Sequence, residues 1–170
     1  MDMQPQTKDA MFEKLYEERF AWVYNYVYFR VRHAQTAEDL TADIFIRAYQ
    51  YFDNFAHEKG EIGAWLSGIT RNAVNTYLRR SLSAPRAAEL TEFIPASVDI
   101  EREYLHTEDM RRVMEQLQLM QQDKQELIAM KYFLHMNNRE IAKATGMSES
   151  NVGSTIHRIV GGLRKTLRAL

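Results

Sequence analysis

Apolar residues recur along most of this chain at three- and four-residue steps, the spacing of one face of an α-helix. The pattern is clearest in residues 9–33, where it predicts one long amphipathic helix. The apolar members of this stripe are Phe12, Leu15, Tyr16, Phe20, Val23, Val27 and Val31. No stretch alternates apolar and polar residues well enough to predict a sheet. The pattern therefore predicts an all-α protein.

Two further helices are predicted in the first half of the chain. Thr36, followed three residues later by Asp39, resembles a capping box and predicts the start of the second helix. A polar break that contains Gly60 precedes a third predicted helix, from Ile62 to Arg80. The apolar stripe of the second helix comprises Leu40, Ile44, Ala48, Phe52 and, beyond it, Phe55. The stripe of the third helix, which we expect to face the core, comprises Ile62, Trp65, Ile69, Ala73 and Tyr77.

The helical pattern dissolves over residues 81–107, which hold two of the three prolines of the chain. This stretch is predicted to be a flexible linker. Helical periodicity resumes near Met110, and further helices are predicted over residues 124–133, 138–145 and 149–168. The chain is therefore expected to form two small helical domains, residues 9–80 and 108–170, joined by that linker.

Residues 138–152 have the spacing of a helix-turn-helix motif. The small Ala142 allows the second helix to approach closely, and Gly146 can take the positive φ that ends a helix tightly. Ser148 is a good N-cap for the second helix, whose Val152 and Ile156 are expected to pack back on the first. In this motif the N-terminal part of the second helix enters the major groove of DNA. The residues predicted to face DNA are Ser150, Asn151, Ser154, Thr155, His157 and Arg158.

A plain helical hairpin with a glycine turn has the same local pattern, so the motif alone leaves that alternative open. The charge distribution favours DNA. The whole chain has a net charge of −1, which by itself argues against a nucleic-acid partner. Residues 81–110, however, carry a net charge of −5 and residues 111–170 a net charge of +5. Because contacts to phosphates dominate affinity for DNA, the basic C-terminal segment favours the functional interpretation.

Several classes of function lack the residues that they need. The chain has no cysteine, which excludes disulfides, a thiolate nucleophile and cysteine-bound zinc. Its five histidines show no metal-binding spacing, and it has no phosphate-binding glycine loop or nucleophile elbow. We therefore expect no metal, no cofactor and no catalytic site. Because residues 1–12 lack an apolar signal core and no apolar run approaches the ~20 residues that span a bilayer, a cytoplasmic protein is expected.

Four segments of the first half together resemble a known family. They are Ala37–Tyr49, Phe52–Phe55, Ala64–Asn72 and Tyr77–Arg80, and they resemble conserved region 2 of bacterial sigma factors. The segment from Leu117 to Leu167 is similar to region 4 of the same family. The closest resemblance is to the extracytoplasmic-function group, which keeps only these two regions. Two motifs in the expected order and at the expected separation are far more specific than either alone.

This resemblance implies a transcription initiation factor that binds core RNA polymerase, directs it to promoters and is not itself a catalyst. It assigns Asp39, Asp43 and Arg47 to contact with the clamp helices of the largest polymerase subunit, and region 4 to the flap region. It implies that the second helix of the helix-turn-helix reads the −35 element and that an anti-sigma factor holds the chain inactive. The third helix and the loop before it would bind the −10 element, where a base is flipped out, through Phe55, Arg71, Asn72, Asn75, Arg79 and Arg80. Phe55 could equally close the core at the end of the second helix.

The chain also departs from the family pattern. Family members usually carry basic residues where this chain has Gly153 and Thr155, and Gly161 with Gly162 weakens the same helix further along. Two alternatives remain at this level. One is a helix-turn-helix regulator that binds duplex promoter DNA without joining polymerase, which would not need Arg71, Asn72 and Arg79. The other is a helical adaptor that binds only protein, which would leave the basic C-terminal helix unexplained.

Overall fold

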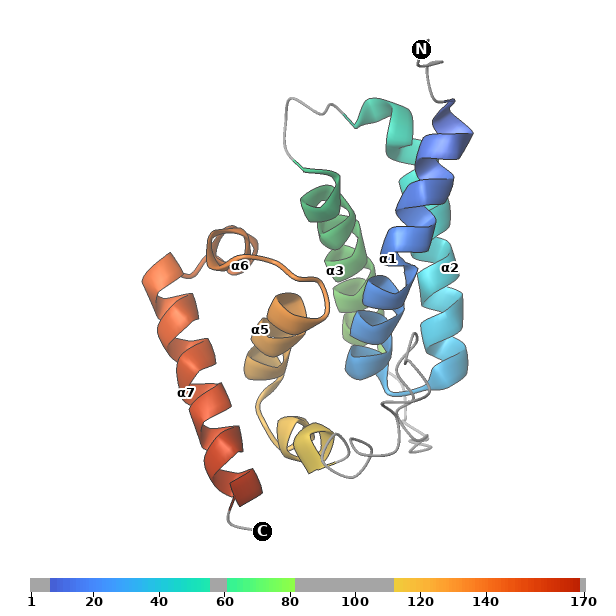
Figure 1. Ribbon diagram of the computed structural model, residues 1–170. Helices are drawn as coiled ribbons and strands as arrows, with labels where there is room; N and C mark the ends of the chain where they lie inside the picture. Colours follow the sequence, from blue (N-terminus) through green and yellow to red (C-terminus); the bar gives the residue numbers. More distant parts are fainter. Residues whose placement is uncertain (1–6, 56–60, 82–111, 169–170) are drawn as a thin grey trace. The chain divides into compact units, whose positions relative to one another are not determined.

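The computed structural model describes residues 7–55, 61–81 and 112–168 (Figure 1). The chain divides into two compact units, residues 1–91 and 92–170. All regular structure in the described residues is helical, which confirms the predicted all-α class. The linker predicted at residues 81–107 lies, apart from Ser81, outside the described residues, so the domain boundaries stay predictions. No helix in the described parts is long and apolar enough to cross a bilayer.

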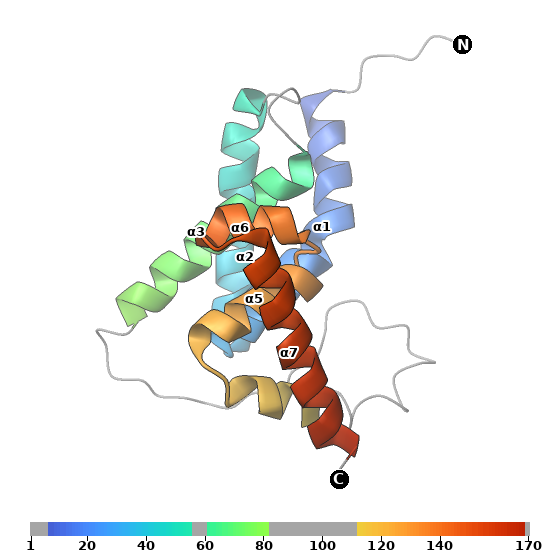
Figure 2. The ribbon, with the colours of Figure 1, turned by 90° about the vertical axis from the view of Figure 1, so that its left-hand side faces the viewer.

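The N-terminal unit is a bundle of long helices, which run side by side in Figure 1, while Figure 2 shows α3 crossing the other two at an angle. Its elements are α1 (Lys8–Val31), α2 (Ala34–Tyr51), the short 3₁₀ helix η1 (Phe52–Asn54) and α3 (Ile62–Ser81). Each long helix contributes to one core. The most deeply buried large side chains of this core are Val23, Tyr26, Val27, Ile44, Leu66 and Val74.

The start of α2 differs from the prediction. Thr36 and Asp39 do not form a capping box: α2 begins at Ala34, and His33 is its N-cap. The Nδ1 atom of His33 accepts a hydrogen bond from the backbone N–H of Thr36 at 3.2 Å. Asp39 instead accepts a hydrogen bond from the side chain of Gln35 at 3.1 Å. The reason is the tight link from α1, whose C-cap Arg32 has a φ of 58° and turns the chain directly into α2.

The buried face of α3 also differs from the prediction. The stripe expected to face the core is only half-buried, and the buried side chains are Leu66, Ser67, Thr70 and Val74. Ser67 and Thr70 enter the core because their hydroxyl groups donate to carbonyl oxygens of their own helix, those of Gly63 and Leu66, both at 2.8 Å. A buried hydroxyl that is hydrogen-bonded in this way costs little. Trp65, interpreted as a core residue, is half-buried at the edge of the core.

The C-terminal unit contains a helical segment over residues 112–118, followed by α5 (Gln122–Tyr132), α6 (Asn138–Thr145) and α7 (Glu149–Arg168). The bounds of α6 and α7 confirm the predicted helices at 138–145 and 149–168. A short turn joins these two helices, which cross steeply (Figure 2). The core of this unit includes Leu117, Leu127, Met130, Ile141 and Val152.

A buried glutamine fixes the turn before α5. Gln125 is 2% exposed, and its Nε2 atom donates to the carbonyl oxygens of Gln118 at 3.2 Å and Met120 at 2.8 Å. These carbonyls lie at and just beyond the end of the helical segment 112–118, where backbone oxygens lack partners within the helix. The single amide therefore satisfies two carbonyls on either side of Leu119 and holds the turn in one conformation.

We expect Gln125→Leu to destabilise the C-terminal unit by about 1–2 kcal/mol, because both carbonyls lose their donor while the side-chain volume is kept. Thermal or urea unfolding followed by circular dichroism measures this change. Gln122→Leu, at an exposed position of the same helix, serves as the matched control. Equal effects of the two substitutions would contradict a special role for the Gln125 amide.

Candidate nucleic-acid interface

The helix-turn-helix is built from local signals that act within a few residues. Asn137 and Glu140 form a capping box at the start of α6: each side chain accepts from the backbone N–H of the other residue, at 2.9 and 2.7 Å. Gly146 ends the helix with a φ of 74°, as predicted. The Oγ atom of Ser148 accepts from the backbone N–H of Asn151 at 3.2 Å, which confirms its predicted capping role. The Asn137 capping box was missed, although an Asn followed three residues later by Glu is a recognisable signal.

The second helix of the motif turns its polar side to solvent. Val152 and Ile156 are buried, as predicted, and hold α7 against the rest of the unit. The residues predicted to face DNA are all exposed except Thr155, which is half-buried. The exposed ones are Ser150, Asn151, Ser154, His157 and Arg158. One face of α7 therefore presents these predicted DNA-contacting side chains together.

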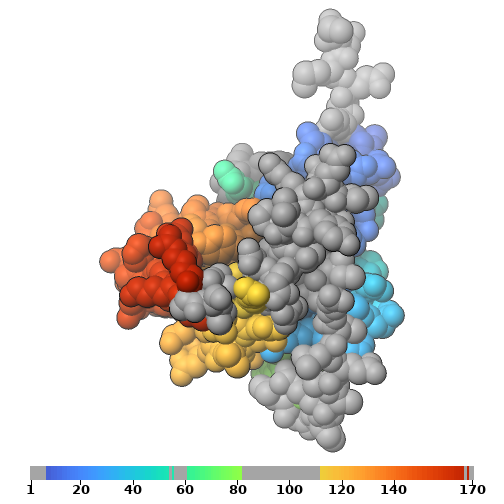
Figure 3. Space-filling model, turned by 60° about the horizontal axis from the view of Figure 1, so that its bottom comes forward, coloured from blue at the N-terminus to red at the C-terminus, as the bar shows by residue number. Residues whose placement is uncertain are grey.

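Several of these side chains are already ordered against one another. The Oγ1 atom of Thr155 donates to Oδ1 of Asn151, and Nη2 of Arg158 donates to Oγ1 of Thr155, both at 3.3 Å. Nε of Arg158 also lies 3.4 Å from the carbonyl oxygen of Ser154. The C-terminal turns of α7 lie at the surface of their unit (Figure 3) and carry exposed Arg164, Lys165 and Arg168. The helix thus has amide and hydroxyl groups for base edges near its start and positive charge for phosphates further along.

Helix α3 brings together most of the side chains assigned to the −10 element. Asn72, Arg79 and Arg80 are exposed, and Arg71 and Asn75 are half-buried along the same helix. Phe55 is half-buried, and its ring packs against that of Trp65 with centroids 5.2 Å apart. The Trp65 ring in turn lies edge-on to Phe52 at 6.3 Å. Phe55 therefore closes the apolar end of the bundle at the point where the chain enters residues 56–60, which lie outside the described residues.

The outer face of α2 carries the three charged residues assigned to a protein partner. Asp39, Asp43 and Arg47 are exposed at successive four-residue steps. Within the part of the chain that the structure describes, Asp43 and Arg47 form no ion pair. Three large hydrophobic side chains on this helix were not predicted to be accessible: Ile46 is 56% exposed, Tyr49 is 40% exposed and Tyr51 is 57% exposed. Ile46 does not belong to the apolar stripe that contains Ile44, and this was the signal in the sequence that could have predicted its exposure. Such a mixture of charged and apolar groups suits a protein contact.

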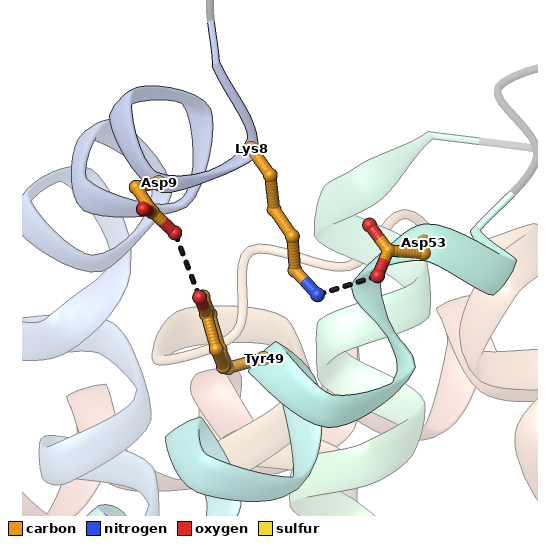
Figure 4. A network of polar contacts seen from close by, with 4 residues as sticks. All are labelled: Lys8, Asp9, Tyr49 and Asp53. Atoms are coloured by element: carbon orange, nitrogen blue, oxygen red, sulfur yellow. Dashed lines mark hydrogen bonds and ion pairs between the residues drawn. The ribbon is translucent and has the colours of Figure 1, made fainter.

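A polar network fastens the first turn of α1 to the end of α2 (Figure 4). Nζ of Lys8 contacts Oδ2 of Asp53 at 2.5 Å and lies over the ring of Tyr49, 4.5 Å from its centroid. The hydroxyl group of Tyr49 donates to Oδ1 of Asp9 at 2.7 Å. The hydrogen bond to Asp9 raises the pKa of Tyr49 above 10.0, and the hydrogen bond to Asp53 raises the pKa of Lys8 above 10.5.

This network predicts a loss of α1–α2 attachment at high pH. The pKa of Tyr49 is higher in the folded chain than in the unfolded one, so the folded state favours the neutral phenol. The contribution to stability is complete below the unfolded pKa of about 10 and is lost as pH rises through the folded value. The ultraviolet difference spectrum between wild type and Tyr49→Phe reports this titration. We expect its midpoint above pH 10 in wild type and closer to 10 in Asp9→Asn; an unchanged midpoint would contradict the assigned cause.

Comparisons with known protein families match both units. Residues 15–82 match the family model described as Sigma-70 region 2, and residues 110–160 match the model described as Sigma-70, region 4. Together the two matches cover α1 from residue 15, α2, α3, α5, α6 and α7 up to residue 160.

Curated relatives and a solved structure agree with these matches. The ECF RNA polymerase sigma factor BldN of Streptomyces coelicolor is 28% identical over 92% of this chain, which spans 60% of that protein's length. The RNA polymerase sigma-E factor of Streptomyces avermitilis is 30% identical over 78% of this chain and 72% of its own length. The sigma factor RpoE of Bartonella quintana, solved in complex with the anti-sigma factor NepR, has the same fold. Its TM-score is 0.70, at 18% identity, over 95% of this chain and 98% of that one.

Proposed function

Because this chain belongs to the extracytoplasmic-function group of the sigma-70 family, we propose that it directs core RNA polymerase to specific promoters and assists DNA melting. It acts as a non-catalytic initiation factor in the cytoplasm, where polymerase works. Residues 9–80 form the region 2 domain, residues 81–107 the linker and residues 108–170 the region 4 domain. The alternatives of a plain regulator or a protein-only adaptor lack support, because one chain carries both the exposed polar face of α3 and that of α7.

The outer face of α2 binds the clamp helices of the largest polymerase subunit. Asp39, Asp43 and Arg47 provide the charges, and exposed Ile46, three residues after Asp43, provides an apolar group beside them. This combination supports a contact in which desolvated apolar area gives affinity and charge gives orientation. The region 4 domain binds the flap region of the polymerase.

Helix α3 and the loop before it bind the −10 element as a separated strand. Asn72 and Asn75 supply amide groups for base edges, and Arg71, Arg79 and Arg80 supply charge for the backbone. A base that leaves the duplex loses stacking, so the protein must offer a replacement surface. Phe55 is half-buried against the Trp65 ring. Only the exposed part of the Phe55 ring is therefore available to stack on such a base.

The α7 helix reads the −35 element in duplex DNA through the exposed face that begins at Ser150. An anti-sigma factor is proposed to regulate the chain by covering these surfaces. The support for this partner is the shared fold of RpoE, whose structure was solved with the anti-sigma factor NepR.

The single observation that carries the proposal is the presence of both sigma regions, in order, in one chain. Run-off transcription with core RNA polymerase, followed by mapping of start sites, tests it. We expect the chain to co-elute with core polymerase and to start specific transcripts. The proposal is wrong if the free chain binds promoter duplex as tightly as the complex with polymerase does and adds no initiation activity.

A further inference from the structure

Gly153 lies in the second turn of α7 and faces α6. A Cβ atom at this position would stand 3.1 Å from Nδ2 of Asn138, which is tighter than an ordinary van der Waals contact. Gly161 and Gly162 of the same helix differ, because a Cβ atom at either position would meet no atom within 4 Å. Of the three glycines in α7, Gly153 is therefore the one at which the absence of a side chain leaves space for a neighbour, the Asn138 amide.

Asn138 is held in this position from the opposite side. Its Oδ1 atom accepts a hydrogen bond from Nζ of Lys131 at 3.0 Å, in a part-buried environment. The amide therefore turns its carbonyl oxygen toward α5 and its NH₂ group toward α7. Asn138 is the first residue of α6. One side chain thus links three helices at the point where the helix-turn-helix begins.

We propose that Gly153 and Asn138 form a matched pair that sets how closely α7 approaches α6, and that reading of the −35 element depends on this spacing. The inference rests on the proposed function. A Cβ atom at position 153 requires the Asn138 amide or α7 itself to shift by a few tenths of an ångström, and the hydrogen bond from Lys131 opposes the shift of the amide. Groups that recognise a ligand must be held within about 0.5 Å of their productive positions, so a shift of a few tenths of an ångström uses much of that tolerance. Gly153 therefore acts as a positioning residue: it affects DNA recognition through the spacing of α6 and α7 and does not itself contact DNA.

The test uses the full chain assembled with core RNA polymerase and a promoter that the wild-type holoenzyme selects from a random library. We expect Gly153→Ala to weaken binding of a duplex that carries the −35 element by about tenfold. Binding of a fork that carries only the −10 element should not change. Adding Asn138→Ala to the Gly153→Ala chain makes room for the new methyl group. The double variant should then bind the −35 duplex within about twofold of Asn138→Ala alone, a non-additivity expected only of residues in contact.

Gly161→Ala is the matched control, since it makes the same replacement in the same helix in open space. It should leave −35 binding unchanged and raise the melting temperature of the C-terminal unit, because alanine favours a helix over glycine. Unchanged −35 binding by Gly153→Ala, or failure of Asn138→Ala to remove its effect, would overturn the matched pair. A wild-type holoenzyme that selects no promoter would instead overturn the proposed function, and this inference with it.

Discussion

Replacing both Asp39 and Asp43 with arginine should release the chain from core RNA polymerase. Both carboxylates are exposed on one face of α2, and neither forms an ion pair within the described part of the chain. Reversing them places positive charge opposite the basic groups that we expect on the clamp helices. Like charges that meet across an interface cost several kcal/mol, so the dissociation constant should rise about a hundredfold or more. Fluorescence anisotropy of labelled chain titrated with core polymerase measures this change.

The matched control reverses Glu13 and Glu17 in the same way. Both are exposed on α1, outside the proposed contact, and the change in net charge is identical. Circular dichroism should show the same melting behaviour for both double variants, because none of the four carboxylates is buried. If the two pairs weaken binding equally, net charge rather than the α2 face governs the association, and the assignment of this face fails.

Asn72→Ala should reduce formation of the open promoter complex by about ten- to hundredfold, because a well-placed amide contact to a base is worth about 1–3 kcal/mol. Asn72 is exposed on α3, so its loss should not affect the core of the bundle. Binding of the −35 duplex and of core polymerase should both remain near wild type. The fluorescence of 2-aminopurine placed in the −10 element measures opening.

Gly68→Ala provides the comparison for this second variant. Gly68 is exposed on the same helix, one turn before Asn72, and a Cβ atom there would meet nothing within 4 Å. It should open promoters normally. A parallel loss of opening and of −35 binding in Asn72→Ala would indicate misfolding or a wrong assignment, since the two elements are proposed to contact different domains.

Features that depend on neighbouring residues were readable from the sequence. The helix-turn-helix follows from Gly146, which ends α6 in the left-handed region, and from Ser148, which caps α7; both act within three or four residues. The bounds of α6 and α7 were predicted for the same reason. The polar exposed face of α7 follows from the same periodicity that buries Val152 and Ile156.

Features that depend on contacts between helices were not readable. The buried face of α3 was predicted wrongly because Ser67 and Thr70 count as polar in any pattern, whereas in the bundle their hydroxyls bond to their own helix. His33 caps α2 because α1 ends at its C-cap Arg32, which places His33 directly before the first residue of α2. The role of Gln125 was also missed: its amide bonds to carbonyls seven and five residues earlier, a spacing outside the capping patterns that were sought.

The amino-acid sequence by itself determined the helical class, the helix-turn-helix, the charge asymmetry and the resemblance to two sigma regions. Those features reside in periodicity, capping residues and composition, which need no partner from elsewhere in the chain. Only the tertiary structure decided which face of α3 is buried and that Gly153 makes room for Asn138. These depend on distances between helices, and such distances are set by packing of side chains that lie far apart in the sequence.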